Sequence, residues 1–298
     1  MNTTAKNTHR AAMVSLASSM FIFGTIGIFV RSIGLPSSLI ALVRSVIGLL
    51  FLLAVTAIRK EGFSLAALKG KLPLLAISGI AMGFNWILLF EAYRYTTVAT
   101  ATLCYYLAPV FLILASPIVL AERLTAKKLI CVVVALAGMV PVSGVLQAGF
   151  SGMQELKGIL LGASAALLYA GVVLLNKRAG ETPPVKRTMV QMAAAAVVLL
   201  PYVLLTEDLS ALAPTPVGVG LLLVVGIIHT GLAYMLYFGS IGNLPAHTLA
   251  IFSYIDPIVA ILLSALLLKE PLGLGSIVGA VLILGAAFIS EQPEKKND

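Results

Sequence analysis

The stretch Tyr106–Leu124, YLAPVFLILASPIVLAERL, occurs a second time in altered form at Tyr254–Leu272, YIDPIVAILLSALLLKEPL. At a shift of 148 residues the two stretches share eight identities, among them a tyrosine, a proline and a glutamate. Each stretch also contains the end of a longer apolar run, Thr96–Ala121 or Leu244–Leu268, of the length that crosses the hydrocarbon core of a bilayer. Chance similarity between two apolar segments would not be expected to place Tyr, Pro and Glu at matching positions. We therefore infer an internal duplication within a membrane protein.

The composition of the chain agrees with a membrane location. Hydrophobic residues make up 60% of the 298 residues and charged residues only 11%, and the mean hydropathy is +1.05. A soluble domain carries roughly 25% charged residues, because its surface faces water. The composition therefore excludes a soluble enzyme, a secreted domain and a disordered protein. It predicts an all-α integral membrane protein that crosses the bilayer several times, because continuous apolar runs do not alternate as β-barrel strands do.

Ten apolar runs of suitable length are predicted to be transmembrane helices. The uncharged stretch from Leu209 to Ile255 is too long for one crossing, and Gly242–Pro245 supplies the expected turn between two of them. The predicted spans are Ala11–Val30, Leu35–Ile58, Leu72–Phe90, Thr96–Ala121, Leu129–Leu146, Gly158–Asn176, Met189–Leu205, Val217–Ser240, Leu244–Leu268 and Leu272–Ser290.

The loop charges predict the orientation of these spans. With a cytoplasmic N-terminus, the inside segments hold fifteen Lys and Arg residues and the outside loops hold four. This difference follows the positive-inside rule. The sequence therefore predicts a cell (plasma or inner) membrane protein with both termini in the cytoplasm. The formal net charge of +8 comes from these loop clusters and does not indicate nucleic-acid binding.

The duplication divides the chain into residues 13–142 and 158–289. Gly83 matches Gly231 and Trp86 matches Tyr234 at the same shift, while Arg44 matches Gln191 at a shift of 147. Each half holds five predicted helices, and an odd number of crossings places the second half upside down relative to the first. The sequence thus predicts two inverted five-helix repeats, an arrangement found in many secondary transporters.

These features resemble the EamA family of the drug/metabolite transporter superfamily. The resemblance rests on five helices per half, an aromatic residue in each third helix (Trp86 and Tyr234), and an in-membrane proline followed by the L-x-E-x-L pattern. It implies a secondary carrier of small metabolites, often amino acids, that works by alternating access. The chain departs from the family at Phe23, where many members have tryptophan near the end of the first helix.

Motifs of other function classes are missing from the sequence. The chain contains no H-E-x-x-H, G-x-S-x-G or G-x-x-x-x-G-K-[ST] pattern and no T-V-G-Y-G filter. We therefore predict a protein that is not an enzyme, needs no cofactor or bound metal, and acts on a small-molecule substrate. Because no ATP-binding loop occurs, uphill transport requires an ion gradient, and protons are the candidate coupling ion.

Two charged residues lie inside predicted spans, where an unpaired charge is costly. Asp256 is expected midway along its span and Arg44 inside the second span. Their repeat counterparts are Ala108 and Gln191, so the shared fold does not require charge at either place. Both are candidates for the transport pathway. The structural alternatives are a buried acid neutralised by protonation or a structural ion pair for Asp256, and a snorkelling side chain or a helix brace for Arg44.

Tyr106 and Pro109 recur as Tyr254 and Pro257. Proline inside a helix removes a hydrogen bond, and interruptions at corresponding places in two halves indicate the binding region of a transporter. We therefore predict helix breaks at both prolines and substrate contacts at both tyrosines. A structural kink and simple packing are the alternatives.

Three further polar or amphipathic residues complete the predicted pathway. Asn85 and Trp86 lie together in the third span, and His229 lies inside the eighth. Trp86 is expected either on a cavity wall or at the membrane interface. His229 is either a packing residue or a pathway residue whose imidazole binds a proton near neutral pH. Glu122 and Glu270 end their helices and are expected to be structural.

Taken with these residues, the family resemblance implies a secondary active transporter of small metabolites such as amino acids, and we expect it to work as an exporter. A facilitative uniporter and a membrane sensor or assembly subunit without transport are the alternatives. The expected state is a monomer or a homodimer in the lipid bilayer.

Overall fold

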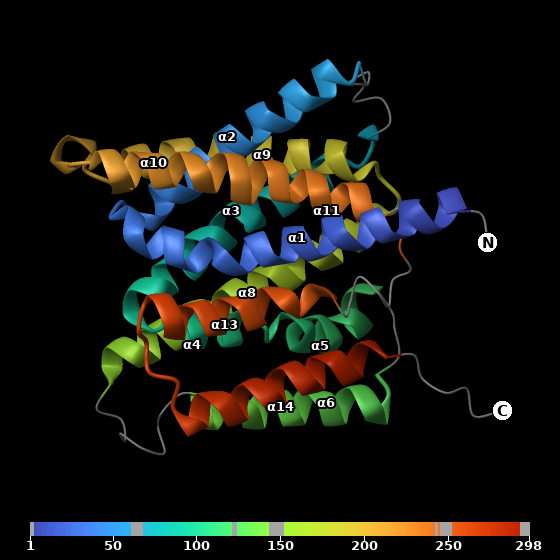
Figure 1. Ribbon diagram of the computed structural model, residues 1–298, viewed down its shortest axis with the longest axis vertical. Helices are drawn as coiled ribbons and strands as arrows, with labels where there is room; N and C mark the ends of the chain where they lie inside the picture. The colour runs from blue at the N-terminus through green and yellow to red at the C-terminus, as the bar shows by residue number, and fades with distance from the viewer. Residues whose placement is uncertain are drawn as a thin grey trace.

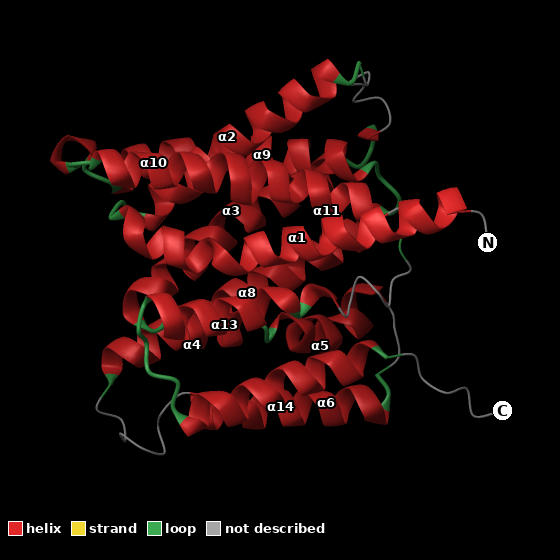
Figure 2. Cartoon of the chain, viewed as in Figure 1, coloured by secondary structure: helices red, strands yellow, loops and turns green. Residues whose placement is uncertain are grey.

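The structure is a computed structural model, and it describes residues 3–60, 68–120, 124–142, 152–241, 244 and 252–292. Throughout these ranges the regular structure is helical and contains no strand (Figure 2). The predicted all-α class is therefore confirmed. Glu122 and the predicted turn at 242–245, apart from Leu244, lie outside the described residues.

The helices follow the apolar runs of the sequence, with boundaries that shift by a few residues. They are α1 (Thr3–Ile33), α2 (Ser37–Ile58), α3 (Leu72–Tyr95), α4 (Val98–Tyr105), α5 (Ala108–Leu120), α6 (Ala126–Val142), α8 (Met153–Ala179), α9 (Pro184–Thr206), α10 (Pro216–Val224), α11 (Ala233–Ile241), α13 (Ile255–Leu267) and α14 (Leu274–Glu291). A π-helical segment, Val225–Leu232, joins α10 to α11 without interruption.

Glycine and proline set several of these boundaries. Gly34 ends α1 with a φ of +69°, a conformation that a residue without a side chain adopts at no steric cost, and Pro36 then precedes α2. Gly180 follows α8 with a φ of +70°, and Pro184 is the first residue of α9. Proline suits that position because the first N–H groups of a helix have no partner within the helix.

Seven helices in the described part of the chain are long and apolar enough to cross a membrane. They are His9–Ile33, Ser37–Ile58, Leu72–Tyr95, Val98–Ala115, Met153–Ala179, Pro184–Thr206 and Pro216–Ser240, with shorter apolar helices at Ile255–Leu267 and Leu274–Ser290. A multi-pass membrane protein is thereby supported. The predicted count of ten full crossings stays a prediction, because α6, α13 and the apolar part of α14, Leu274–Ser290, are shorter than these seven.

The helices form a bundle whose centre is α3, which packs along α8 and α9 (Figure 1). α1 contacts α11 and α13 on one side of this centre, and α6 and α14 form a pair at one edge of the bundle. The outer surface is apolar: Ile118 and Leu205 are 87% and 86% exposed. Side chains of this kind are unfavourable in water at such exposure and suit a lipid environment.

Polar contacts tie the loops together at each end of the bundle. At one end, Lys71 donates to the Glu181 carbonyl (2.6 Å) and Lys127 donates to the Gln292 carbonyl (2.7 Å). At the other end, Arg31 forms an ion pair with Glu270. Each contact joins segments for which the sequence predicted the same side of the membrane.

Glu270 is the centre of the contacts at that second end. Its carboxylate accepts hydrogen bonds from the backbone N–H of Val98 (2.9 Å) and from the Ser264 hydroxyl, and Arg31 also donates to the Thr96 carbonyl (3.1 Å). Glu270 therefore holds the first turn of α4 against the ends of α1 and α13. The structure gives Glu270 the helix-end position that the sequence predicted.

Candidate functional site

A cavity of about 330 Å³ lies between α1, α2, α3, the α4–α5 junction, α8, α11 and α13. Of the nine residues predicted for the pathway or for the helix breaks, six lie on its wall: Arg44, Trp86, Tyr106, Pro109, Tyr254 and Asp256. Both halves of the sequence contribute to the wall. Concave, largely apolar sites with a few convergent polar groups are typical of small-molecule binding.

The helix break beside the cavity is a turn at Tyr106 and Leu107. The N–H groups of these two residues bond to the carbonyls of Thr102 (3.0 Å) and Cys104 (3.1 Å), after which α5 begins at Ala108. Residues 252–253 are likewise helical and are followed by a turn at Tyr254. In the described residues, each interruption therefore coincides with a tyrosine of the repeated pattern.

The two prolines lie just after these interruptions and not within continuous helices. Pro109 is the second residue of α5, and Pro257 is the third residue of α13. In the first helical turn an N–H has no partner in the helix, so proline is tolerated there. The chain is thus interrupted near both predicted helix breaks, but each interruption precedes its proline, which lies in the first turn of the next helix. Prolines inside helices are found at Pro117, Pro141 and Pro201.

The two interruptions contact each other at the wall of the cavity. The Tyr106 hydroxyl donates to the Ser253 carbonyl (3.0 Å) and contacts the Asp256 carboxylate (3.3 Å). The ring centroids of Tyr106 and Tyr254 lie 6.4 Å apart. Asp256 lies in the first turn of α13, and not midway along a long helix as predicted, because the described helix begins at Ile255. A carboxylate in this position is stabilised by the positive end of the helix dipole.

α1 packs closely against the start of α13 at Gly24. A Cβ atom added to Gly24 would lie 2.6 Å from the Asp256 carbonyl oxygen and 2.7 Å from the Val259 Cβ. The absence of a side chain at this position allows the two helices to approach. Gly24 also lies on the cavity wall, so this contact fixes the position of Asp256 relative to α1.

Arg44 enters the cavity from α2. Its side chain is only 3% exposed, its Nε atom donates to the Thr230 hydroxyl (3.1 Å), and its guanidinium lies over the Trp86 ring, 4.1 Å from the centroid. Within the part of the chain that the structure describes, Arg44 makes this one hydrogen bond and no ion pair. Asp256 lines the same cavity but lies outside the 4.0 Å ion-pair distance.

Thr230, the partner of Arg44, lies in the π-helical segment. Its hydroxyl also donates to the carbonyl of Val225, five residues earlier (2.9 Å). π-helical turns within α-helices are rare and occur frequently at functional sites. The segment places Thr230 opposite α2, where it orients the guanidinium.

Asn85 and His229 are buried between helices and do not line the cavity. Asn85 is 1% exposed, donates to the Ala165 carbonyl (2.6 Å) and contacts the Tyr105 hydroxyl (3.4 Å). His229 is also 1% exposed, and its Nε2 atom is 2.8 Å from the Thr25 hydroxyl. Both side chains join helices, α3 to α8 and the π-helical segment to α1, rather than line the cavity.

Sequence reasoning missed most of the aromatic wall. Seven of the nine tyrosines line the cavity: Tyr93, Tyr105, Tyr106, Tyr169, Tyr234, Tyr237 and Tyr254. Phe23, at the position where the chain departs from the resembled family, also lines the cavity, 5.3 Å from the Tyr234 ring centroid. A tyrosine hydroxyl inside an apolar span needs a polar partner or a water-filled cavity. The tyrosines within the apolar spans were therefore a signal of the cavity that the sequence contained.

No grouping of His, Cys, Asp and Glu side chains suited to a metal ion occurs within the described ranges. The groups that the described residues present to the cavity are one guanidinium, one carboxylate, several phenol hydroxyls and aromatic faces.

The comparisons with known proteins agree with a transport protein. The EamA-like transporter family matches residues 10–144 and 156–291. Uncharacterized transporter YxxF from Bacillus subtilis (strain 168) is 31% identical over 286 residues, with 94% of this chain and 89% of the relative covered. Protein RarD from Escherichia coli (strain K12) is 25% identical, with 92% and 91% covered.

The fold also matches a solved protein. A crystal structure aligns with a TM-score of 0.66 at 23% identity, covering 94% of this chain and 97% of the other. This likeness shows a shared fold, and the family match over nearly the whole chain confirms the resemblance found in the sequence. The chain therefore belongs to the EamA-like transporter family, in the drug/metabolite transporter superfamily.

Proposed function

We propose that the protein is a secondary active transporter that exports small metabolites such as amino acids across the cell membrane by alternating access. One observation carries the proposal: Arg44 and Asp256, of opposite charge, line one aromatic cavity without pairing with each other. A zwitterion can pair with both charged groups: its carboxylate binds the planar guanidinium of Arg44, and its ammonium group binds the carboxylate of Asp256. The apolar and aromatic wall then accepts the rest of the molecule.

Asp256 is also our candidate for energy coupling. It is the one acidic residue on the wall of the cavity among the residues that the structure describes. An acid inside the membrane is a usual carrier of protons in transporters, and the sequence offers no ATP-binding loop. We propose that Asp256 binds either a proton or the ammonium group of the substrate, so that the two compete.

Ten crossings in two inverted repeats, residues 13–142 and 158–289, complete the proposal. The matching interruptions at Tyr106 and Tyr254 and the pairing of same-side loops support it. We expect reporter domains fused after Lys71 and after Lys186 to lie in the cytoplasm, and one fused after Arg94 to lie outside. If the fusions after Lys71 and Lys186 lie on opposite sides of the membrane, the ten-crossing topology is wrong.

The function is tested with purified protein in proteoliposomes. Amino acids, nucleosides and sugars are screened for uptake and efflux, with and without an imposed pH gradient. We expect at least one amino acid to accumulate against its gradient when protons flow. Equilibration without accumulation would instead indicate a facilitative uniporter, and no movement of any compound would favour a non-transporting membrane protein.

A further inference from the structure

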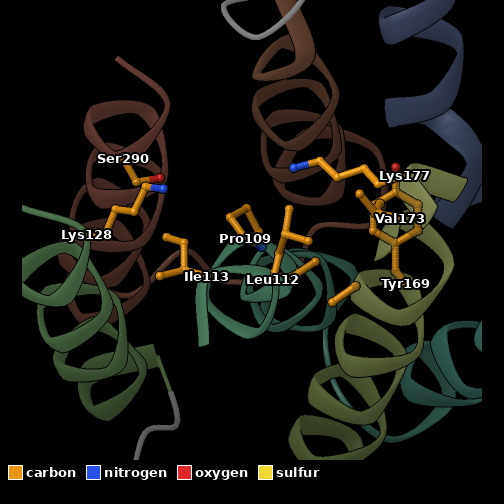
Figure 3. Close-up of a pocket in the computed structure, with 10 residues that line it drawn as sticks. Pro109, Leu112, Ile113, Lys128, Tyr169, Val173, Lys177 and Ser290 are labelled. Atoms are coloured by element: carbon orange, nitrogen blue, oxygen red, sulfur yellow. The ribbon is translucent and has the colours of Figure 1, made fainter. Parts of the chain in front are cut away.

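A second pocket lies between α5, α6, α8 and α14 and has a volume of about 310 Å³. Its floor is apolar and includes Leu112, Ile113 and Val173, whereas Lys128, Lys177 and Ser290 form its polar part (Figure 3). None of the described residues that line it is acidic. The pocket therefore combines an apolar interior with positive charge.

The polar part lies at helix ends. Lys128 is the third residue of α6, Lys177 is two residues from the end of α8, and Ser290 is one residue from the end of α14. In Figure 3 the Lys177 side chain extends from α8 toward the helices that carry Lys128 and Ser290. These helix ends belong to the end of the bundle where Lys127 bonds to Gln292, for which the loop charges predict the cytoplasmic side.

The apolar part continues inward along α8. From Lys177 to Ala170, which also lines the pocket, seven residues of helix span about 10 Å. A ligand for this pocket thus has an anionic group at the depth of the lipid headgroups and an apolar part that extends toward the membrane centre.

We propose that this pocket binds an anionic phospholipid of the cytoplasmic leaflet. The phosphate group lies between Lys128 and Lys177, and part of one acyl chain lies against Leu112, Ile113 and Val173. Basic pockets between transmembrane helices on the cytoplasmic side suit such headgroups, because the lysines attract the phosphate and the apolar walls exclude water. The pocket shares Ala108, Pro109 and Tyr169 with the central cavity, so a bound lipid touches residues of the substrate site.

The test measures lipid retention by the full chain in detergent with native mass spectrometry. Phosphatidylglycerol and phosphatidylcholine of equal chain length are the probes, and inorganic phosphate is the soluble competitor. We expect wild type to retain phosphatidylglycerol in preference to phosphatidylcholine. The double variant Lys128→Gln/Lys177→Gln should lower that preference at least fivefold. Millimolar inorganic phosphate should not displace the lipid, because the acyl chain contributes to binding.

Lys127→Gln is the matched control, since this neighbouring lysine bonds to the Gln292 carbonyl and does not line the pocket. It should retain the preference of wild type. Val173→Trp keeps both lysines and fills the apolar part, and it should reduce retention of both lipids. The inference is overturned by an unchanged preference in the double variant, by an equal loss in Lys127→Gln, by full retention in Val173→Trp, or by displacement with inorganic phosphate. The experiment measures lipid retention and not transport. Its result therefore tests the lipid site independently of the proposed function.

Discussion

Arg44 and Gln191 occupy matching places in the two halves of the sequence, and their surroundings differ. Gln191 is 4% exposed, and its Nε2 atom donates to the Ser78 hydroxyl (2.6 Å) and to the side-chain Oδ1 atom of Asn176 (2.9 Å). Arg44 makes one protein hydrogen bond within the described chain and lines a cavity. The amide belongs to a closed hydrogen-bond network, whereas the guanidinium lies at the wall of the cavity.

Helix packing explains part of this difference. A Cβ atom added to Gly79 would lie 2.6 Å from the Gln191 Cα, so α3 and α9 touch directly at that place. Around Arg44 the contacts are instead the Trp86 ring and the Thr230 hydroxyl, which leave the guanidinium at the cavity. The polar residue in the second half joins packed helices, and the one in the first half lines the cavity. Experiments on the two halves should therefore give different results.

The largest effect is expected for Asp256→Asn. The amide fills the same space and can keep the contact with the Tyr106 hydroxyl, so the variant should fold. It carries no charge and no titrating proton, so gradient-driven accumulation should be lost in proteoliposomes with an imposed pH gradient.

The control for this variant is Asp208→Asn. Asp208 is exposed in the segment between α9 and α10, where hydrogen bonds from Ser210 hold the pKa of its carboxyl below the ordinary value. Accumulation should persist in this control. Full accumulation by Asp256→Asn would make Asp256 a packing residue and require another coupling group.

A smaller effect is expected for Arg44→Gln. This variant places in the first half the residue type that the second half has at the matching position, Gln191. Hydrogen bonds to charged groups contribute about 1.5–3 kcal/mol. Losing the guanidinium should therefore raise the substrate concentration at half-maximal uptake about 10- to 100-fold, with thermal stability near that of wild type. Unchanged half-saturation in this variant would contradict a substrate contact at Arg44.

The smallest effect on transport is expected for Gln191→Leu. This change leaves the Ser78 hydroxyl and the Asn176 side chain without their amide donor, which costs about 1–3 kcal/mol of stability. The apparent unfolding temperature should fall while the half-saturation concentration stays the same. A large rise in half-saturation with no loss of stability would mean that Gln191, and not only Arg44, serves the substrate.

The apolar runs of the sequence predicted most of the helices but not the geometry at their breaks. The span predicted at Leu35–Ile58 is Ser37–Ile58 in the structure. The span predicted at Thr96–Ala121 is divided at Tyr106, because hydropathy reports side-chain polarity and carries no information on backbone hydrogen bonds. Pro109 lies near the break without marking its position, since proline is compatible with the first turn that follows it.

The site could be predicted only in part for a similar reason. Charge inside an apolar span singled out Arg44 and Asp256, because such charge is costly in lipid. Asn85 gave the same signal in the sequence but bonds to the Ala165 carbonyl, and only tertiary packing distinguishes a satisfied polar group from an available one. The distance between Arg44 and Asp256 depends on how α2 and α13 pack, which no local pattern specifies.

Trp86 allows the central proposal to be measured directly. It is the only tryptophan of the chain, it lines the cavity, and the Arg44 guanidinium lies 4.1 Å from its ring centroid. The measurement is the fluorescence of the purified protein, titrated with the amino acid that gives the strongest uptake, with its decarboxylated amine and with its deaminated acid. We predict a saturable change for the amino acid and binding about tenfold weaker or more for each analogue. Equal affinity for all three compounds, or no change with any of them, would contradict a site in which Arg44 and Asp256 together hold a zwitterion.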